Sequence, residues 1–200
     1  MQLDIALKEW AIVCDFLADG KSCLVLRKGG INEHGGPGRF DLAFERFLMF
    51  PAWEHERLDW IKPDWMPGTA PGGKANMTPV PKGVGEPKEI VFRGYAEVAD
   101  IWEVPSREAF DSLDDLHGWL PPQIDMRFDY KPERPLFLIA LRAFRLSEPV
   151  VVPNREDYAG CKSWVPLPPG SEVDVSRARR AIPEGAFESI LERVDRAMGG

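Results

Sequence analysis

Cysteine is scarce in this sequence, and the spacing of the few cysteines argues against two kinds of cross-link that stabilise small folds, disulfide bonds and zinc sites. The three cysteines, Cys14, Cys23 and Cys161, lie far apart, and no two of them form a CxxC pair. An odd number without paired spacing argues against a disulfide framework and against a zinc ribbon. We therefore expect reduced thiols.

Long apolar runs and an excess of positive charge are also lacking. No run approaches the roughly 18 apolar residues that span a membrane, and the first residues have neither the basic nor the apolar region of a signal peptide. These absences predict a cytoplasmic protein without a membrane partner. A net charge of -7 argues against a general binder of the phosphate backbone, although a local basic patch is compatible with it.

The chain does contain enough apolar material for one core. It has 200 residues, of which 44% are hydrophobic, and a chain of this length buries roughly 70% of its unfolded surface. We expect a single domain over residues 1–200. Residues 62–88 hold six prolines and five glycines, a density that blocks helix and sheet ladder alike, so we interpret this stretch as a loop insertion.

Hydrophobic periodicity predicts a mixture of strands and helices. Residues 3–17 fit the helical period and also the alternation of a strand, and we favour a helix. In residues 44–50 an apolar run ends at Pro51, which cannot donate to a ladder. The other predicted strands are residues 23–26, 90–104 with a bulge at Gly94, 136–141, 150–152 and 163–167.

Two further segments have the signals of helices. Ser106 is a suitable N-cap for a short acidic helix that ends at His117. Residues 183–198 carry an apolar stripe between a proline and two glycines, which is typical of an amphipathic helix. Together these elements predict an α+β fold, in which one domain has a curved, mostly antiparallel sheet with flanking helices.

Predicted strand ends carry the candidate ligand-binding residues. Arg27, Lys28, Gly29 and Gly30 place two cations beside glycines whose backbone N–H groups can turn toward an anion. A solvated turn with ordinary surface charges is the alternative. The further candidates at strand ends are Arg142, Lys162, Ser163 and Trp164.

The apolar stretch FLMFPAWEHER ends in the candidate catalytic pair. Glu54 and His55 supply a carboxylate and an imidazole, the groups most used for proton transfer near neutral pH. The alternative is a charged, solvated helix start. A divalent metal would need a third ligand, for which His34, His117 and Cys161 are available, and no metal or other cofactor is firmly implied.

The chain resembles a bacterial family, domain of unknown function 1802, in the stretches ALKEWAIVCDFLADGKSCLVLRKGGI, FLMFPAWEHE, FDYKPERPLFLIALRAFRL and YAGCKSWVPL. The resemblance covers most of the chain and implies no activity. The sequence departs from the family pattern at Ala52 and Glu56, where threonine and glutamine are expected. A role that depends on that hydroxyl or amide is therefore not expected here.

Two more distant resemblances concern the fold. The order of elements is similar to that of PUA-like ASCH domains, small barrels linked to RNA, although Ser22 and Val25 replace the lysine and glutamate of the ASCH signature. These replacements argue against an ASCH-type amidohydrolase. The same order also resembles the core of PD-(D/E)XK nucleases, with Glu9 as the acid of the first helix and no obvious catalytic lysine.

Three functions follow as hypotheses. In the first, a nucleic-acid or nucleotide binding module holds phosphate on the basic residues of the strand ends, while Trp53 or Trp164 stacks on a base. In the second, a phosphodiester hydrolase uses Glu54 and His55 as acid and base, with or without a metal. The third is a protein-interaction module built on the acidic segment 95–134, which has ten acids against four bases.

The first two hypotheses share a geometric condition, because sequence distance does not show which residues meet in space. Glu54 and His55 should lie within about 10 Å of Arg27, Lys28 or Lys162, the span over which screened charges act together. If they lie farther apart, Glu54 and His55 are surface residues at a strand end without a role in a binding or catalytic site.

Overall fold

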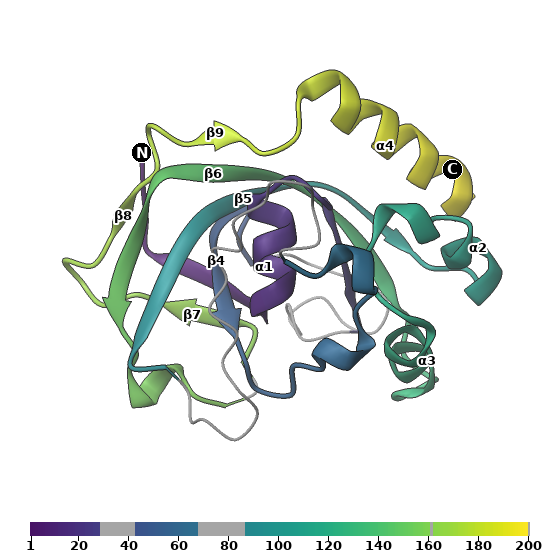
Figure 1. Ribbon diagram of the computed structural model, residues 1–200, viewed down its shortest axis with the longest axis horizontal. Coiled ribbons are helices and arrows are strands. Elements are labelled where there is room, and N and C mark those ends of the chain that lie inside the picture. The colour runs from purple at the N-terminus through teal and green to yellow at the C-terminus, as the bar shows by residue number, and fades with distance from the viewer. Residues whose placement is uncertain (29–42, 68–86, 161, 200) are drawn as a thin grey trace.

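The computed structural model describes residues 1–28, 43–67, 87–160 and 162–199. Within these residues, seven strands form one strongly curled sheet, which arches as a half-barrel over helix α1 (Ala11–Ala18) (Figure 1). Further helices flank the curl. The predicted α+β domain with a curved, mostly antiparallel sheet is confirmed.

The sheet is antiparallel apart from one pair of strands. Its members are β2 (Ile5–Trp10), β3 (Leu24–Arg27), β4 (Arg46–Ala52), β5 (Glu89–Glu103), β6 (Phe137–Pro153), β7 (Trp164–Pro166) and β9 (Arg179–Arg180). They run in the order β3, β6, β5, β4, β2, β7, with β9 on β6, and β2 pairs with β4 in parallel. A separate two-stranded sheet joins β1 (Gln2–Leu3) to β8 (Val173–Asp174).

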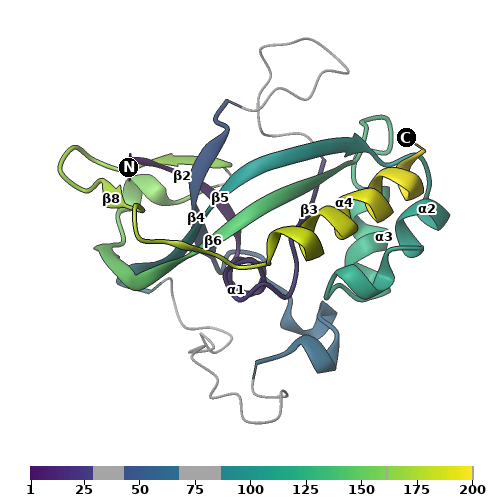
Figure 2. The same ribbon diagram turned by 90° about the horizontal axis from the view of Figure 1, so that it is seen from above.

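Helices lie inside the curl and at one end of the molecule. Besides α1, the described residues form α2 (Arg107–Asp111), α3 (Pro121–Asp129) and α4 (Glu184–Met198). Short three-ten turns span Leu58–Trp60, Pro63–Trp65, Asp114–Leu116 and Glu156–Tyr158. Helix α1 packs on β4, β5 and β6, whereas α2, α3 and the end of α4 gather at the end opposite the N-terminus (Figure 2).

Both faces of β4 are buried, so this strand is apolar along nearly its whole length. Along β4, Phe47 and Met49 belong to the cluster around α1, while Leu48 and Phe50 belong to a second cluster. The second cluster also includes residues of β8 and the buried ring of Tyr158. Burial on two faces explains why β4 is a continuous apolar run rather than an alternating one.

The curl follows from two register shifts between β5 and β6. They lie between Phe92 and Gly94 and between Val98 and Asp100, and the first confirms the bulge predicted at Gly94. A Cβ atom at Gly94 would come within 2.5 Å of the backbone oxygen of Phe144. Glycine is therefore required at this point of β5, where the backbone of β6 comes too close for a side chain. Bulges such as this one add the twist that bends a sheet.

Two element predictions were wrong, and one helix was missed. Residues 3–17 are a strand followed by α1, whose near-complete burial hides the helical period. Residues 150–152 are not a separate strand but the end of β6, and α3 was not predicted. Pro51 lies inside β4, at a position where β5 no longer pairs, so the missing N–H leaves no ladder bond unmade.

Part of the predicted insertion is ordered against the body of the fold. Residues 68–86, like Gly29, Gly30, His34 and Cys161, lie outside the described residues, so the insertion itself stays a prediction. The Trp65 ring, in contrast, packs edge-on against Phe16 of α1, with ring centroids 5.3 Å apart.

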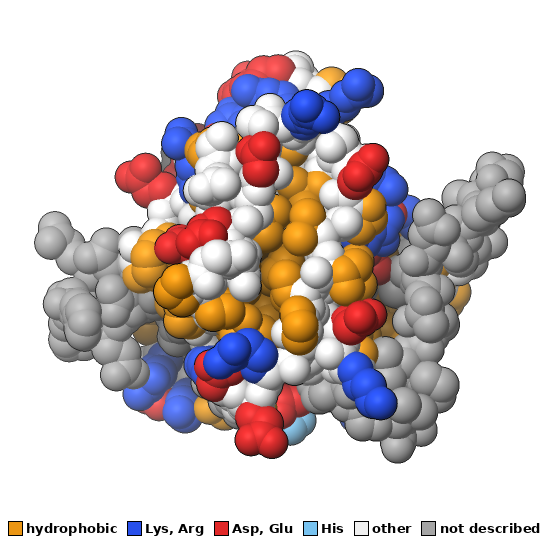
Figure 3. Space-filling model, turned by 90° about the vertical axis from the view of Figure 1, so that its left-hand side faces the viewer, with side chains coloured by type: hydrophobic (Ala, Val, Ile, Leu, Met, Phe, Trp, Pro, Cys, Tyr) orange, Lys and Arg blue, Asp and Glu red, His pale blue; other side chains and the backbone are white. Residues whose placement is uncertain are grey.

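One face carries a band of hydrophobic side chains between charged ones (Figure 3). The exposed hydrophobic residues of the structure include Val91 and Val151, register partners on β5 and β6 that are 38% and 53% exposed. Among the described residues, no helix combines the length and the apolar character needed to cross a membrane.

Candidate functional site

A pocket of about 530 Å³ opens beside the carboxyl ends of β2 and β4. These strands run in parallel, with Trp10 opposite Ala52, so the residues that end them reach the same edge of the sheet. The turn after β4, helix α3 and the loop before β7 complete the walls. The charged and aromatic residues of this basic pocket are Lys8, Glu9, Trp10, Arg27, Glu54, His55, Arg57, Trp60, Arg127 and Lys162.

Arg27 ends β3 and reaches across to β2. Its Nη2 is 2.9 Å from Glu9 Oε2 and also donates to the backbone oxygen of Lys8, while its Nη1 donates to Ser163 Oγ at 3.4 Å. The Arg27 and Glu9 side chains are only 12% and 13% exposed. This ion pair therefore fixes the floor of the pocket. The Nε atom of Arg27 is buried and has no hydrogen-bond partner among the described residues.

Arg127 of α3 is the second guanidinium at this floor. Burial lowers the pKa of Arg127, the carboxylate of Glu9 opposes that effect, and the positive charge of Arg27 adds to it. Within the described residues the Arg127 guanidinium makes no ion pair, and its buried Nε has no hydrogen-bond partner. Two guanidiniums thus lie near one carboxylate, and the partly buried Arg127 has no ion-pair partner of its own among the described residues.

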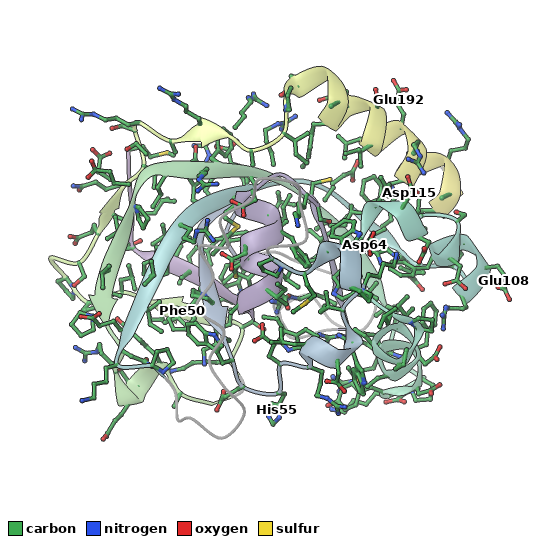
Figure 4. All side chains as sticks on the ribbon, viewed as in Figure 1. Phe50, His55, Asp64, Glu108, Asp115 and Glu192 are labelled. Atoms are coloured by element: carbon green, nitrogen blue, oxygen red, sulfur yellow. The ribbon has the colours of Figure 1, made fainter. Side chains whose placement is uncertain are left out.

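A tight turn presents Glu54 and His55 at the mouth of the pocket. The N–H of Glu56 donates to the backbone oxygen of Trp53 at 3.2 Å, and His55 has φ 61° in the left-handed region. Figure 4 shows His55 at the lower edge of the molecule, on the turn below β4. Non-glycine residues adopt this conformation at a cost, and the surrounding structure must hold them there.

Glu56 anchors this turn to α1. Its Oε1 accepts a hydrogen bond from the N–H of Ile12 at 2.9 Å, one of the N–H groups that a helix start leaves unpaired. Burial raises the pKa of Glu56 to about 6; the hydrogen bonds from Ile12 and Ala11 lower it, and Asp15 raises it. A glutamine oxygen, expected here from the family pattern, could accept the same bond.

Of the remaining cations of the pocket, Arg57 has an ion-pair partner at short distance, whereas Lys8 and Lys162 have weaker or backbone partners. Lys8 Nζ lies 3.8 Å from Glu54 Oε2 and donates to the backbone oxygen of Gly160 at 3.2 Å. Lys162 Nζ donates to the backbone oxygen of Asp157. Arg57 pairs with Asp59 at 2.7 Å and lies over the ring of Trp60, 4.3 Å from its centroid. Five cationic side chains therefore face two carboxylates in this pocket.

The structure brings together only some of the predicted site residues. Glu54, His55, Arg27 and Lys162 line the same basic pocket, so the acid and the imidazole share its wall with two of the predicted cations. Ser163 lies behind the pocket floor as an acceptor for Arg27. The glycines that follow Lys28, and Cys161, lie outside the described residues.

The other predicted residues serve the fold. Lys28 Nζ donates to the backbone oxygens of Arg127 and Phe128, so it closes the end of α3. Arg142 pairs with Glu184 and Glu188 of α4, and the ring of Trp164 packs edge-on against Phe44 and Phe47. Lys28, Arg142 and Trp164 do not line the pocket. Trp53 packs against the second core cluster.

The predicted metal ligands do not converge among the described residues. No group of three or more His, Cys, Asp or Glu side chains suited to a metal is present in the described part of the chain. His117 is buried between Phe110 and Trp119, with ring centroids 4.8 and 5.1 Å away, and burial lowers its pKa to about 4. It is therefore a neutral core residue rather than a partner of His55.

Two further predictions change in the structure. Glu9 lies on β2 and pairs with Arg27, so it is not the acid of a first helix that a PD-(D/E)XK core would require. The acidic segment 95–134 is partly neutralised. Its ion pairs with basic residues are Asp115 with Arg193, Asp114 with Lys62, Asp111 and Asp125 with Arg107, and Glu97 with Arg46.

Sequence reasoning missed half of the pocket. Lys8 and Trp10 were hidden because residues 3–17 were interpreted as one helix, and the sequence IALKEW of β2 has no alternation that would reveal a strand. Met126 and Arg127 lie on the unpredicted α3. Trp60 follows the turn without any local pattern, and only the folded chain shows that it reaches the pocket.

Comparison with known proteins identifies a family but no function. No curated protein and no solved structure matches the chain, so the distant likeness to ASCH domains stays a prediction. The sequence model of a family described as a domain of unknown function (DUF1802) matches residues 6–193. That range includes nearly the whole described fold and every residue of the basic pocket. The chain therefore belongs to the DUF1802 family.

Proposed function

We propose that the basic pocket binds a phosphate-bearing ligand, either a nucleotide or a nucleic acid. The observation that carries this proposal is the Arg127 guanidinium, which lines the pocket beside Arg27 and makes no ion pair within the described residues. Arg127 is partly buried, with its Nε enclosed and unpaired, and desolvation of a cation is costly unless an anion compensates it. Guanidinium groups match the oxygens of phosphate in geometry as well as in charge.

The rest of the lining supports phosphate over a smaller anion. The pocket has an excess of three positive side chains in a chain whose net charge is -7. Its volume of about 530 Å³ is in the range of sites for small organic ligands. Trp10, Trp60 and Met126 supply an apolar wall on which the sugar or base of a nucleotide could pack.

The test is binding of inorganic pyrophosphate and of uridine monophosphate to the Arg127→Gln variant, measured by calorimetry. Loss of a charge-assisted hydrogen bond should weaken affinity by roughly tenfold or more. Arg127 is a better choice than Arg27, because removing Arg27 would leave the Glu9 carboxylate buried and alone.

A matched control is Arg196→Gln, which removes an exposed cation from the last turn of α4, outside the pocket. It should bind both probes as the parent protein does. If Arg127→Gln also binds them unchanged, or if the parent binds neither, the proposed function is wrong.

A metal-assisted or metal-free phosphodiester hydrolase is the second candidate, and the position of Glu54 and His55 favours it. Both side chains line the same pocket as the cations, and His55 is held at φ 61°, a strain that clusters at functional sites. In this reaction His55 and Glu54 would transfer protons to and from a phosphodiester held by the arginines.

Hydrolysis is tested by turnover of bis(p-nitrophenyl) phosphate and of RNA, with and without Mg²⁺ or Mn²⁺. The informative variant is His55→Gly, because glycine adopts a positive φ without strain and the turn is preserved. Activity that disappears in His55→Gly while pyrophosphate binding remains would support the hydrolase. Absence of turnover in the parent protein under all these conditions would remove this candidate.

We also propose a cytoplasmic location. It is supported by Cys14 and Cys23, which are buried free thiols, as expected in a compartment that keeps cysteine reduced. Separating cell fractions and detecting the protein in each one tests this location directly.

A further inference from the structure

A second cavity adjoins the basic pocket. Its volume is about 280 Å³, and its lining includes Lys8, Phe50, Lys88, Asn154 and Arg155. Lys8 lines both cavities. The loop before β7 is also shared, because Tyr158 and Ala159 line the second cavity whereas Gly160 and Lys162 line the first.

Lys8 physically joins the two cavities. Its Nζ lies 3.8 Å from Glu54 Oε2, at the basic pocket, and 5.5 Å from the centroid of the Phe50 ring, at the second cavity. The Lys8 side chain is 12% exposed and borders both cavities, so a ligand that occupies the two of them would pass this ammonium.

The second cavity also has more cations than acids, because Lys8, Lys88 and Arg155 line it together with one carboxylate, that of Glu156. Lys88 is exposed and makes no ion pair within the described residues, whereas Arg155 is engaged by Asp157 at 2.9 Å. The amide of Asn154 donates to the backbone oxygen of Pro87 at 2.8 Å, which fixes the chain next to Lys88. Lys88 is thus a positioned cation without a protein partner in the described structure.

The geometry points to single-stranded nucleic acid as the ligand, with one phosphate in the basic pocket, the next at Lys8 and a further one at Lys88. This inference rests on the proposed function and goes beyond it, since a mononucleotide would fill the first cavity and leave the second unused. Unpaired phosphates spaced along a flexible chain match a row of cations in recessed cavities. A duplex, which is a wide convex rod, would not enter them.

The experiment compares uridine monophosphate with hexauridylate on the full chain, by calorimetry or fluorescence anisotropy. Hexauridylate should bind roughly tenfold or more tightly, because phosphates held at the second cavity add to those in the first. Lys88→Ala should remove most of this gain and leave the affinity for uridine monophosphate unchanged. Arg196→Ala, at an exposed cation outside both cavities, should change neither affinity.

The outcomes separate this inference from the proposed function. If both ligands bind equally, or if Lys88→Ala leaves the gain intact, the second cavity is not part of the site and only this inference is overturned. If neither ligand binds, both proposals are overturned. Equal affinity for duplex RNA, or for a polyglutamate peptide of the same charge, would overturn the assignment to single-stranded nucleic acid.

Discussion

Glu56 shows how one side chain ties the candidate site to the fold. It follows His55 in the turn, and its carboxylate accepts the N–H of Ile12 at the start of α1. Burial holds its pKa at about 6, above the ordinary 4.5. The resemblance led us to expect glutamine at this position and no role for the amide, but the contact needs only an oxygen, which both side chains supply.

Glu56→Gln should raise the free energy of unfolding at neutral pH and leave it unchanged near pH 4. A folded pKa of about 6 against 4.5 means that the folded state holds the proton more tightly, so stability is lost as pH rises through about 6. The loss amounts to roughly 1–2 kcal/mol, and glutamine, which does not ionise, avoids it. Urea unfolding from pH 4 to pH 8 measures the difference between variant and parent.

The control is Glu192→Gln, which changes an exposed carboxylate of α4 (Figure 4). Its stability curve should run parallel to that of the parent across this pH range. Equal pH dependence of Glu56→Gln and the parent would show that the Glu56 carboxylate titrates as an exposed group does.

At the scale of elements, β5 and β6 shape the molecule. They pair along nearly their whole length, and the register shifts beside Gly94 and Asp100 bend them over α1. This bend brings β3 close enough for Arg27 to reach Glu9 on β2, a strand that is not its neighbour in the sheet. The curl is therefore what closes the floor of the basic pocket.

Gly94→Ala should destabilise the protein by about 2 kcal/mol or more, because the new Cβ would lie 2.5 Å from the backbone oxygen of Phe144 and 2.4 Å from the Met49 methyl. The matched variant is Gly185→Ala in the first turn of α4, where a Cβ meets nothing within 4 Å. That change should stabilise the protein by a few tenths to about 1 kcal/mol. Thermal unfolding of both variants measures these changes in stability. If Gly94→Ala is as stable as the parent, β5 and β6 have room for a side chain at this position, and the close contact is wrong.

Local patterns were enough for elements that have one buried and one exposed face, and for a helix start with a capping side chain. The alternation of β5, the Ser106 cap and the stripe of α4 all predicted what the structure has, and Ser106 Oγ does accept the N–H of Ala109. The pattern failed at α1, because near-complete burial makes the helical period and the alternation equally apolar, and at β2, whose residues IALKEW do not alternate. It also failed at α3, whose first turn is stabilised by two prolines rather than by an apolar stripe.

At the scale of the whole molecule, the site could be predicted only in part. Glu54, His55, Arg27 and Lys162 were suggested by their positions at strand ends, and the structure gathers them. Arg127 could not be selected from the sequence, since nothing local distinguishes it from other surface arginines. Its importance comes from the tertiary fold, which packs α3 against the Arg27 and Glu9 pair.

The charge distribution leads to a final prediction about salt. The chain carries a net charge of -7, yet the basic pocket has an excess of three positive side chains, so an anionic ligand is attracted locally and repelled by the rest of the surface. Added salt screens exposed charges over about 10 Å at 0.1 M and about 3 Å at 1 M, but it screens the buried Arg127 much less.

Affinity for pyrophosphate should therefore fall severalfold as salt rises from about 0.05 M to about 0.5 M, and it should then level off rather than vanish. Uridine, which has no phosphate, should show no such dependence, and Arg127→Gln should lose the salt-resistant part of the affinity. Calorimetric titrations across this range of salt concentration measure the affinity of the parent protein for pyrophosphate and for uridine, and the affinity of Arg127→Gln for pyrophosphate. An affinity that salt abolishes completely would place the ligand on the exposed Lys162 rather than at the partly buried Arg27 and Arg127.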